Sequence, residues 1–416
     1  MTNQRVVVTG IGAIAPNGIG KEAYWKGLLE GKNAIGSITR FDASRFASRM
    51  GGEVRDFKPH PLIPESHLSS MDRAYQMGLT ASFMAFEDAG LDIKRLDVNR
   101  AGVYMGLAVA AVDRYEEDFC HWRKGEPGKV SAHWYQGWFP SACSGYISLI
   151  LGLRGTSQVI STGCCASPDA IGMAFDAIRA GREDLALAGG CEAPLTPMAV
   201  NAFCSMRALS TRNEDPTHAS RPFDKERDGF VMAEGGGVIV LESLAHAKAR
   251  GATLYAELKG YGTTSNAYHM TAPDPSGEQT ARGLCLALED AGLPPEAIDV
   301  VMTHGSSTPL NEKAETRAIK KAMGKHAARL AIPSIKSMIG HPLGSAGVLQ
   351  IIAAIGCLVR QAVPPTINYE FPDPECDLDC VPNHGRLMTV RNVLVNSAGF
   401  SGKNTATLVA KMEELC

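Results

Sequence analysis

Two adjacent cysteines, Cys164 and Cys165, stand in the segment STGCCASPDA, directly after a short run of apolar and β-branched residues. The pattern predicts a strand, a sharp corner and then a helix, because Pro168 suits the first turn of a helix. A helix N-terminus lowers the pKa of a thiol placed beside it. Cys164 lies at the corner and is a candidate nucleophile. Geometry alone leaves an equal alternative, in which both thiols are buried and only fill space.

Two histidines occur in glycine-flanked turns after apolar strands, where α/β proteins place ligands. His304 lies in VMTHGSSTP, and His341 lies in SIKSMIGHPLGSAG, five residues after Lys336. A thiolate used for acyl chemistry needs such proton or hydrogen-bond partners. The small-residue segment NSAGFSGKN at 396–404 could add backbone N–H donors for an oxyanion.

The composition limits the classes of protein that the chain could represent. It has 416 residues, of which 45% are hydrophobic and 20% charged, so a large folded core is expected. A net charge of -3 without a long basic block argues against binding to nucleic acid. The N-terminal segment lacks the apolar stretch of a signal peptide, and no uninterrupted apolar run of about 18 residues occurs. We therefore expect a cytoplasmic protein that does not bind membranes.

The eleven cysteines are odd in number and scattered, without a CxxC pair. This spacing does not suit a metal site, so no metal is expected. Most of the cysteines are expected to be buried thiols in a reducing compartment.

Short β-branched runs alternate with longer helical patterns, which predicts an α/β layered protein. Arg5–Thr9 is expected to be a strand followed by a glycine-rich turn, and Arg73–Ala89 a long helix. A buried strand at Gln158–Ser161 is expected to lead into the helix Pro168–Ala180. In the second half we expect strand Leu254–Gly260, helix Gln279–Ala291, strand Val300–Thr303, helices Glu312–Met323 and Val348–Arg360, and strands Val393–Asn396 and Thr405–Val409.

The GxGxxA pattern at Gly10–Ala15 resembles a dinucleotide-binding fingerprint. However, Pro16 and Gly18 interrupt the place where the phosphate-binding helix should start, and the acidic residue expected about twenty positions later is missing. We therefore expect a tight structural turn here and no cofactor.

Together these motifs resemble those of a β-ketoacyl-acyl-carrier-protein synthase of the thiolase superfamily. The resemblance covers nearly the whole chain and includes VVVTGIGAIAPNG, SMDRA, STGC, NAYHMT, HGSSTP, SIKSMIGHPLGSAG and NSAGFSG, in this order. It implies an α/β, five-layered α-β-α-β-α fold made of two related halves. Here these would be residues 1–255, with the nucleophilic cysteine, and 256–416, with two catalytic histidines. It also implies a dimer that condenses a malonyl unit, with loss of carbon dioxide, onto an enzyme-bound acyl chain.

The resemblance assigns roles to particular residues. Cys164 matches the acyl-accepting nucleophile. His304 and His341 match the pair that binds the malonyl thioester carbonyl and promotes decarboxylation. Lys336 matches a lysine that orders the site, and Glu315 its acidic neighbour.

The loop GFSGKN at 399–404 matches the family's pattern at some positions and differs from it at others. Phe400 matches a gating aromatic residue whose backbone N–H pairs with that of Cys164 as the oxyanion hole. Ser401 and Lys403 stand where the family has Gly and Thr, and Cys165 stands where a small polar residue is usual. These differences leave the mobility of the loop open.

Several stretches, including STGC followed by Asp169, favour the ketosynthase-alpha subunit of type II polyketide synthases. Its partners would be an acyl carrier protein, docked near Arg207 and Lys129, and a chain-length-factor homologue in a heterodimer. A fatty-acid elongating ketosynthase acting as a homodimer is the alternative. A biosynthetic thiolase and a non-enzymatic chain-length-factor-like scaffold are disfavoured, the latter by the presence of the cysteine and both histidines.

Overall fold

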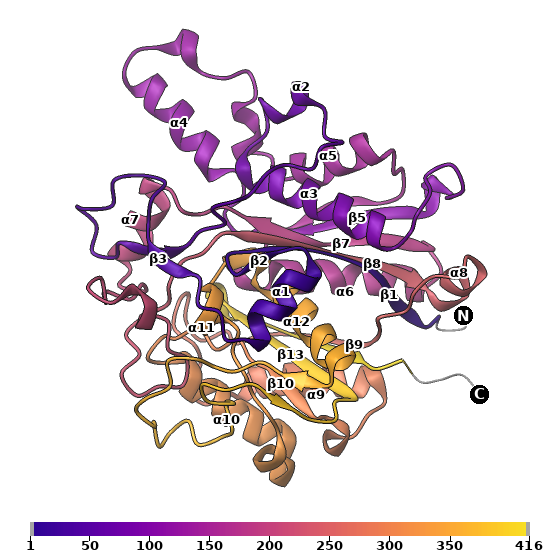
Figure 1. Cartoon of the computed structure of the whole chain (residues 1–416), viewed down its shortest axis with the longest axis vertical. Coiled ribbons are helices and arrows are strands. Elements are labelled where there is room, and N and C mark those ends of the chain that lie inside the picture. Colours follow the sequence, from indigo (N-terminus) through magenta and orange to yellow (C-terminus); the bar gives the residue numbers. More distant parts are fainter. Residues whose placement is uncertain (1–3, 413–416) are drawn as a thin grey trace.

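The chain folds into alternating layers of helices and sheet, as Figure 1 shows from top to bottom. The computed structural model describes residues 4–412. Within them, ten strands form one mixed sheet in the order β10-β13-β14-β9-β1-β8-β7-β5-β6, with β2 paired to β1. The bounds of these strands are β1 (Val6–Ala15), β2 (Gly18–Ile19), β5 (Ala101–Gly106), β6 (Ser157–Ile160), β7 (Leu185–Glu192), β8 (Gly235–Ser243), β9 (Ala256–Ser265), β10 (Val300–Met302), β13 (Asn392–Gly399) and β14 (Lys403–Ala410).

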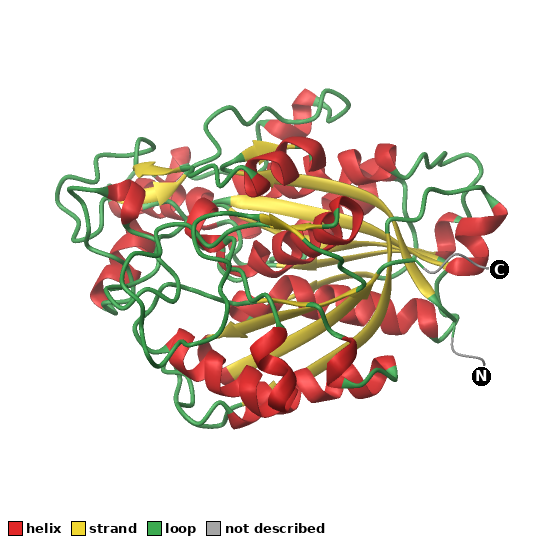
Figure 2. Ribbon diagram, turned by 60° about the horizontal axis from the view of Figure 1, so that its bottom comes forward, coloured by secondary structure: helices red, strands yellow, loops and turns green. Residues whose placement is uncertain are grey.

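Helices cover both sections of this sheet (Figure 2). The longer ones are α3 (Arg73–Asp88), α4 (Val112–Arg123), α5 (Ala142–Leu151), α6 (Ala166–Arg179), α7 (Pro197–Ser205), α9 (Glu278–Ala291), α10 (Asn311–Met323) and α12 (Ala346–Arg360). Smaller elements are α1 (Lys21–Leu29), β3 (Ile35–Ser37), β4 (Met50–Gly52), α2 (Glu65–Leu68), α8 (Leu244–Ala249), α11 (Lys336–Ile339), β11 (Ala362–Val363) and β12 (Arg386–Leu387).

The two sections of the sheet meet at a short antiparallel pairing. Val6–Val8 of β1 pair with Ala256–Leu258 of β9. On one side of this junction β1 continues against β8, and on the other β9 continues against β14. The sheet can therefore diverge into two sections that enclose helices between them.

The middle layer consists of α6 and α12, which pack against each other and against strands of both sections. The segment Leu343–Arg360 is long and apolar enough to cross a membrane, but 89% of it is buried inside the protein. An apolar surface all round is what a helix needs when it is packed on every side. With α3 and α5 outside one section and α9 and α10 outside the other, this arrangement confirms the five-layered fold expected for the thiolase superfamily.

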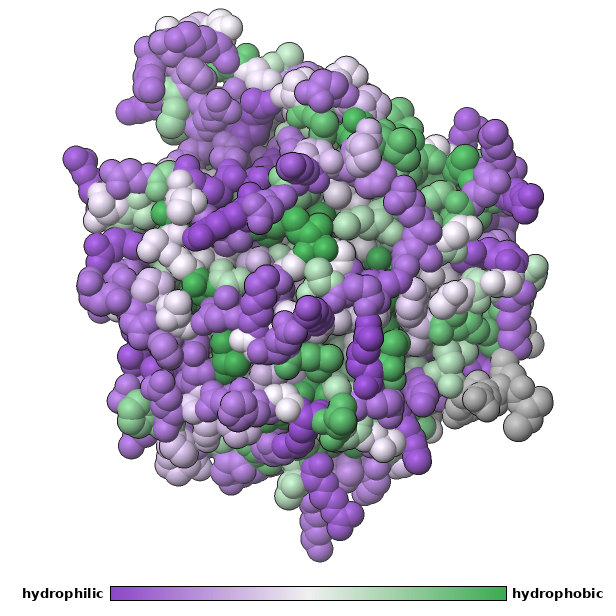
Figure 3. All heavy atoms as spheres, in the orientation of Figure 1, coloured by the Kyte–Doolittle hydropathy of each residue, from purple (hydrophilic) through white to green (hydrophobic). Residues whose placement is uncertain are grey.

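The outer surface differs from this interior. On the face shown in Figure 3, hydrophilic residues predominate and the hydrophobic ones lie in small, separate groups. Such a face suits contact with water.

The strand expected to be buried before Cys164 is an edge strand. β6 pairs only with β5 on the described path of the sheet, and its residues Ser157–Ile160 are exposed or half-buried. The sequence prediction of burial was therefore wrong, since a short apolar run does not reveal whether a neighbouring strand lies on its far side.

The glycine-rich segment after Thr9 is also not a turn. β1 continues to Ala15 with a shift of register between Val8 and Gly10. A Cβ atom on Gly12 would lie only 2.0 Å from the carbonyl oxygen of Ala81 in α3. The glycines therefore allow α3 to pack directly on the backbone of β1, which corrects the predicted turn.

This close approach can be tested with Gly12→Ala. The added methyl group must displace α3, so we expect the free energy of unfolding to fall by about 1–3 kcal/mol. Urea denaturation measures it, with Gly128→Ala as the control, because a Cβ there meets nothing within 4 Å. Equal stability of the two variants would contradict the account.

Candidate active site

Cys164 lies in a tight corner between β6 and α6. The corner is a 3-10 turn over Gly163–Cys165, and α6 begins at Ala166. Gly163 has φ 60°, in the left-handed region that favours glycine. The predicted strand, corner and helix are thus present, and Cys165 points into the buried side while Cys164 is partly accessible.

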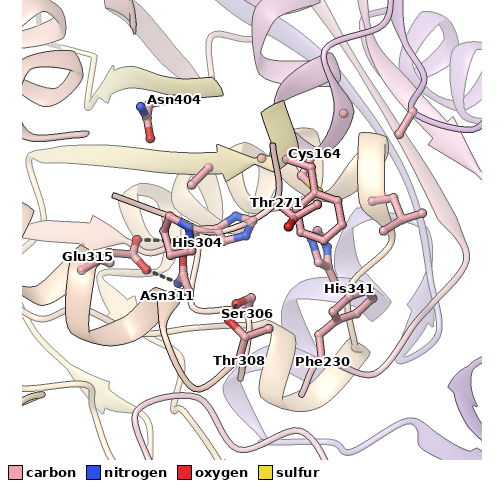
Figure 4. Close-up of a pocket in the computed structure, with 18 of the residues that line it drawn as sticks. Cys164, Phe230, Thr271, His304, Ser306, Thr308, Asn311, Glu315, His341 and Asn404 are labelled. Carbon is pink, nitrogen blue, oxygen red and sulfur yellow. Dashed lines mark hydrogen bonds between the residues drawn. The ribbon is translucent and has the colours of Figure 1, made fainter. Parts of the chain in front are cut away.

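The structure brings Cys164, His304 and His341 together around one cavity of about 240 Å³ (Figure 4). His304 follows β10, and His341 follows the short helix α11. The two imidazole rings lie 5.2 Å apart between centroids and nearly perpendicular, at 83°. Phe230 packs edge-on against His341, with 5.3 Å between the ring centroids. Only 5% of His304 and 3% of His341 is exposed, so water has little access to either ring.

Glu315 fixes the backbone of the turn that carries His304. Its carboxylate accepts the backbone N–H groups of His304 (2.7 Å) and Gly305 (2.9 Å). The side-chain amides of Asn311 (3.1 Å) and Asn396 (2.6 Å) donate to the same carboxylate. A carboxylate that accepts four N–H groups is held in one position and needs no cation in direct contact.

Lys336 connects the two histidine turns. Its ammonium group, only 1% exposed, donates to the carbonyl oxygen of His304 and to the side-chain oxygen of Gln350 (3.1 Å). The amide nitrogen of Gln350 in turn donates to the carbonyl oxygens of Thr303 (2.6 Å) and Asn396 (3.1 Å). Gln350 thus joins the ends of β10 and β13 to the lysine.

Sequence reasoning missed Gln350, Asn311, Asn396 and Glu192 as members of the site. Glu192, at the end of β7, is fully buried, and its carboxylate accepts the N–H groups of Ala108 (2.7 Å) and Val109 (3.2 Å), which line the cavity. The apolar helix pattern of 348–360 contains Gln350 on a buried face, which was the one available signal.

The electrostatic environment keeps both histidines uncharged. Burial, and next the nearby Lys336 charge, lower the pKa values of His304 and His341 well below their ordinary value. Burial also lowers the pKa of Lys336 to about 8, although the Glu315 carboxylate favours its charged form. At pH 7 each neutral imidazole has one N–H donor and one acceptor nitrogen.

The backbone N–H groups of Cys164 and Phe400 lie near enough to the sulfur of Cys164 to favour its thiolate form and so lower its pKa slightly. Phe400 begins the turn after β13, and its ring stacks on Phe203 with the centroids 6.2 Å apart. Ser401 in this turn has φ 65°, although it is not glycine. The oxyanion hole expected from these two N–H groups stays a prediction.

The pKa of Cys164 differs from the expectation. Burial raises it to about 11, which outweighs the opposing effects of the Lys336 charge and the two N–H groups. Backbone N–H groups lower this pKa, but the net shift is upward, because burial destabilises the thiolate more than these groups stabilise it.

The residues predicted to dock a carrier protein lie outside the cavity. Arg207 is exposed in the turn after α7 and takes part in none of the ion pairs between described residues. Lys129 lies beyond α4 and pairs with Glu126 at 2.9 Å. The structure does not place either beside Cys164. Within residues 4–412, no three His, Cys, Asp or Glu side chains gather as a metal site requires.

Comparison with known proteins identifies the family. Residues 3–247 match the N-terminal domain of β-ketoacyl synthases, and residues 255–370 match the C-terminal domain. The chain belongs to the β-ketoacyl synthase family. It is a β-ketoacyl-acyl-carrier-protein synthase, a condensing acyltransferase.

Relatives of this synthase carry two kinds of name. The 3-oxoacyl-[acyl-carrier-protein] synthase 2 of Synechocystis is 44% identical, with 99% of each chain covered. A Streptomyces halstedii protein assigned as a polyketide β-ketoacyl synthase is 43% identical, also over 99% of each chain.

Solved structures of synthases show the same fold. A type II polyketide ketosynthase, bound to a hexaketide and in complex with its acyl-carrier protein, has a TM-score of 0.91 and 38% identity, covering 99% of this chain and 100% of that one. The ishigamide ketosynthase/chain length factor has a TM-score of 0.93 and 36% identity, with the same coverage.

The high pKa of Cys164 predicts its reactivity. Alkylation by iodoacetamide should accelerate about tenfold per pH unit between pH 7 and 9, since only the thiolate reacts. Lys336→Met removes the cation that favours the thiolate, so alkylation at pH 7 should be slower still. Peptide mass spectrometry measures the rate, with the exposed Cys120 as internal reference. A rate that levels off below pH 8 would contradict the raised pKa.

Proposed function

We propose that Cys164 of this synthase carries the acyl chain, while His304 and His341 hold the malonyl thioester and promote loss of its carboxylate. The observation that carries the proposal is the convergence of one partly accessible thiol and two buried, neutral imidazoles on one cavity, with the N–H groups of Cys164 and Phe400 close to the thiol. Neutral donors in a site that excludes water stabilise developing negative charge effectively.

In the first step, the sulfur of Cys164 attacks the carbonyl carbon of an acyl chain carried as a thioester. The N–H groups of Cys164 and Phe400 receive the oxyanion that forms. The new bond between carbon and the Cys164 sulfur forms as the bond to the carrier sulfur breaks. The thiol proton ends on the departing carrier sulfur, which is needed because the thiol is protonated at rest.

In the second step, His304 and His341 donate their N–H groups to the carbonyl oxygen of a malonyl thioester. The bond to the carboxylate breaks, carbon dioxide leaves, and the electron pair becomes an enolate that these donors stabilise. The enolate carbon attacks the acyl carbonyl on Cys164. The thioester bond to Cys164 breaks, its electron pair stays on the sulfur as a thiolate, and a proton from the solvent restores the thiol.

The comparison of Cys164→Ala with Cys165→Ala tests this assignment. The Cys164→Ala variant is incubated with carrier protein that bears an acyl chain. Intact-mass spectrometry should then show no acyl adduct on the variant, and its condensation rate should fall by more than about a thousandfold. Cys165→Ala should keep the adduct and a rate within about threefold, because Cys165 is buried and its thiol donates to the carbonyl oxygens of Ser397 and Lys403. Condensation by Cys164→Ala would refute the proposal.

The pathway that we infer is polyketide synthesis, with this chain as the ketosynthase-alpha subunit beside a chain-length-factor homologue. The segment around α4 exposes large aromatic side chains, with Trp122 61%, Trp138 57% and Phe139 59% exposed. The edge strand β6 leaves backbone groups open for pairing. Exposed aromatic residues on this scale favour a subunit interface.

The second candidate is a fatty-acid elongating synthase that pairs with its own copy. It is favoured by the 44% identity to a 3-oxoacyl-[acyl-carrier-protein] synthase 2. In either case we propose an acyl-carrier protein as the substrate carrier, attracted by the exposed Arg207. The cysteines among the described residues are all free thiols, which supports a reducing compartment such as the cytoplasm.

The subunit proposal predicts how the purified chain behaves. Light scattering should detect a 1:1 complex with the chain-length-factor homologue, and condensation should require it. Trp122→Ser should weaken this association by about 30-fold, as removal of a central interface tryptophan does. Leu387→Ser, 84% exposed in the distant strand β12, is the control. A stable homodimer that condenses without the homologue would favour the fatty-acid alternative.

A further inference from the structure

A buried carboxylate, Asp169, lies in the first turn of α6 beneath the nucleophile corner. It is 3% exposed. One carboxylate oxygen accepts the hydroxyl of Thr162 (2.6 Å), two residues before Cys164. The other accepts the hydroxyls of Tyr261 (2.8 Å) in β9 and Thr405 (2.6 Å) in β14. The carboxylate is thus bonded both to the corner and to two strands of the other section of the sheet.

Asp169 also forms an ion pair with a lysine. The ammonium nitrogen of Lys403, 29% exposed, lies 3.7 Å from the Asp169 oxygen that binds Thr162. Lys403 is the first residue of β14 and directly follows the turn that begins with Phe400. The ion pair therefore attaches one end of that turn to the corner.

The two backbone N–H groups near the Cys164 sulfur come from opposite sides of this attachment. One belongs to the corner itself, and the other to Phe400 at the end of β13. β13 and β14 pair in register, with Ser397 opposite Thr405 and Gly399 opposite Lys403. Asp169 binds Thr405 and Lys403 and so holds β14 in place. Because β13 is paired with β14, this also sets the position of the Phe400 N–H that follows β13.

Close packing leaves little freedom in the same region. A Cβ on Gly399 would lie 3.2 Å from the backbone nitrogen of Cys164. A Cβ on Gly172 of α6 would lie 2.4 Å from the ring of Tyr261. The nucleophile corner and α6 pack here directly against the second section of the sheet, and hydrogen bonds to one carboxylate join the three.

We propose that Asp169 is a positioning residue of the condensing reaction, which sets the distance between the Cys164 and Phe400 N–H groups by binding both sections of the sheet. The inference rests on the proposed function of Cys164. Asp169 does not touch the acyl chain. It acts through Thr162 on one side and through Thr405 and Lys403 on the other.

The test separates two reactions of the same protein. The rate of acyl transfer from acyl-carrier protein to Cys164, measured by intact mass in a single turnover, depends on the paired N–H groups. Decarboxylation of malonyl-carrier protein by the unacylated enzyme depends on His304 and His341 instead. In Asp169→Asn, acyl transfer should slow about 10- to 100-fold, as a misplaced oxyanion donor predicts, with KM within twofold. Decarboxylation should stay within about threefold of the wild type.

Two further comparisons keep the test informative. Asp176→Asn, on the same helix but in an exposed pair with Arg179, should leave both rates unchanged. Thr405→Val removes only the hydroxyl that binds Asp169 and should slow acyl transfer, whereas Thr405→Ser keeps the hydroxyl and should restore it to within twofold. If Asp169→Asn does not fold, the two Thr405 variants still test whether Asp169 positions the oxyanion donors.

The outcomes that overturn the inference are distinct from failure of the proposed function. If wild-type protein acylates Cys164 but Asp169→Asn and Thr405→Val do so within twofold of it, Asp169 has no positioning role. If both rates fall together in proportion to the folded fraction, the role is structural only. If the wild type is not acylated at Cys164 at all, the proposed function itself fails.

Discussion

The contact between the first turns of α6 and α12 determines the geometry of the whole site. The backbone N–H of Val348 donates to the hydroxyl of Ser167 (3.0 Å), and a Cβ on Gly347 would lie 2.4 Å from the ring of Pro168. Cys164 directly precedes α6, and His341 precedes α12. Because these two helices cannot slide past each other, the thiol and the imidazole keep a fixed separation, although they are 177 positions apart in the sequence.

The second determinant is the small number of charges inside the site. Lys336 supplies one cation and Glu315 one anion, both held by hydrogen bonds to backbone and amide groups. Burial raises the pKa of Glu192 to about 8, so this third group is mostly neutral at pH 7. The groups assigned to the chemistry, Cys164 and the two histidines, are neutral at rest. Charge then develops only during reaction, in an environment where fixed donors act strongly and need no reorganisation. This explains why a thiol with a raised pKa is compatible with the proposed attack on a thioester.

The fold and the principal site residues follow from the sequence where the local pattern is strong. The strand before His304 and the helix at 346–360 have periodic apolar residues, so their type and approximate ends were predictable. The predicted strand ended at Thr9, whereas β1 continues to Ala15. Gly10 and Gly12 have no side chain that could show the alternation of a strand, and their role, to let α3 pack on β1, is visible only in the folded protein. The pKa of Cys164 depends on how deeply tertiary packing buries it, which no local pattern contains. Gln350 and Asp169 are single polar residues whose partners lie far away in sequence. The division at residue 255 stays a prediction.

Simultaneous measurement of three quantities tests the central claim most directly. Enzyme carrying a quantified acyl group on Cys164 is mixed with malonyl-carrier protein, and carbon dioxide, free Cys164 thiol and β-ketoacyl product are followed in one turnover. The account predicts that one carbon dioxide is released and one thiol regenerated for each product formed. Product formed without loss of the acyl group from Cys164, or without release of carbon dioxide, would contradict it.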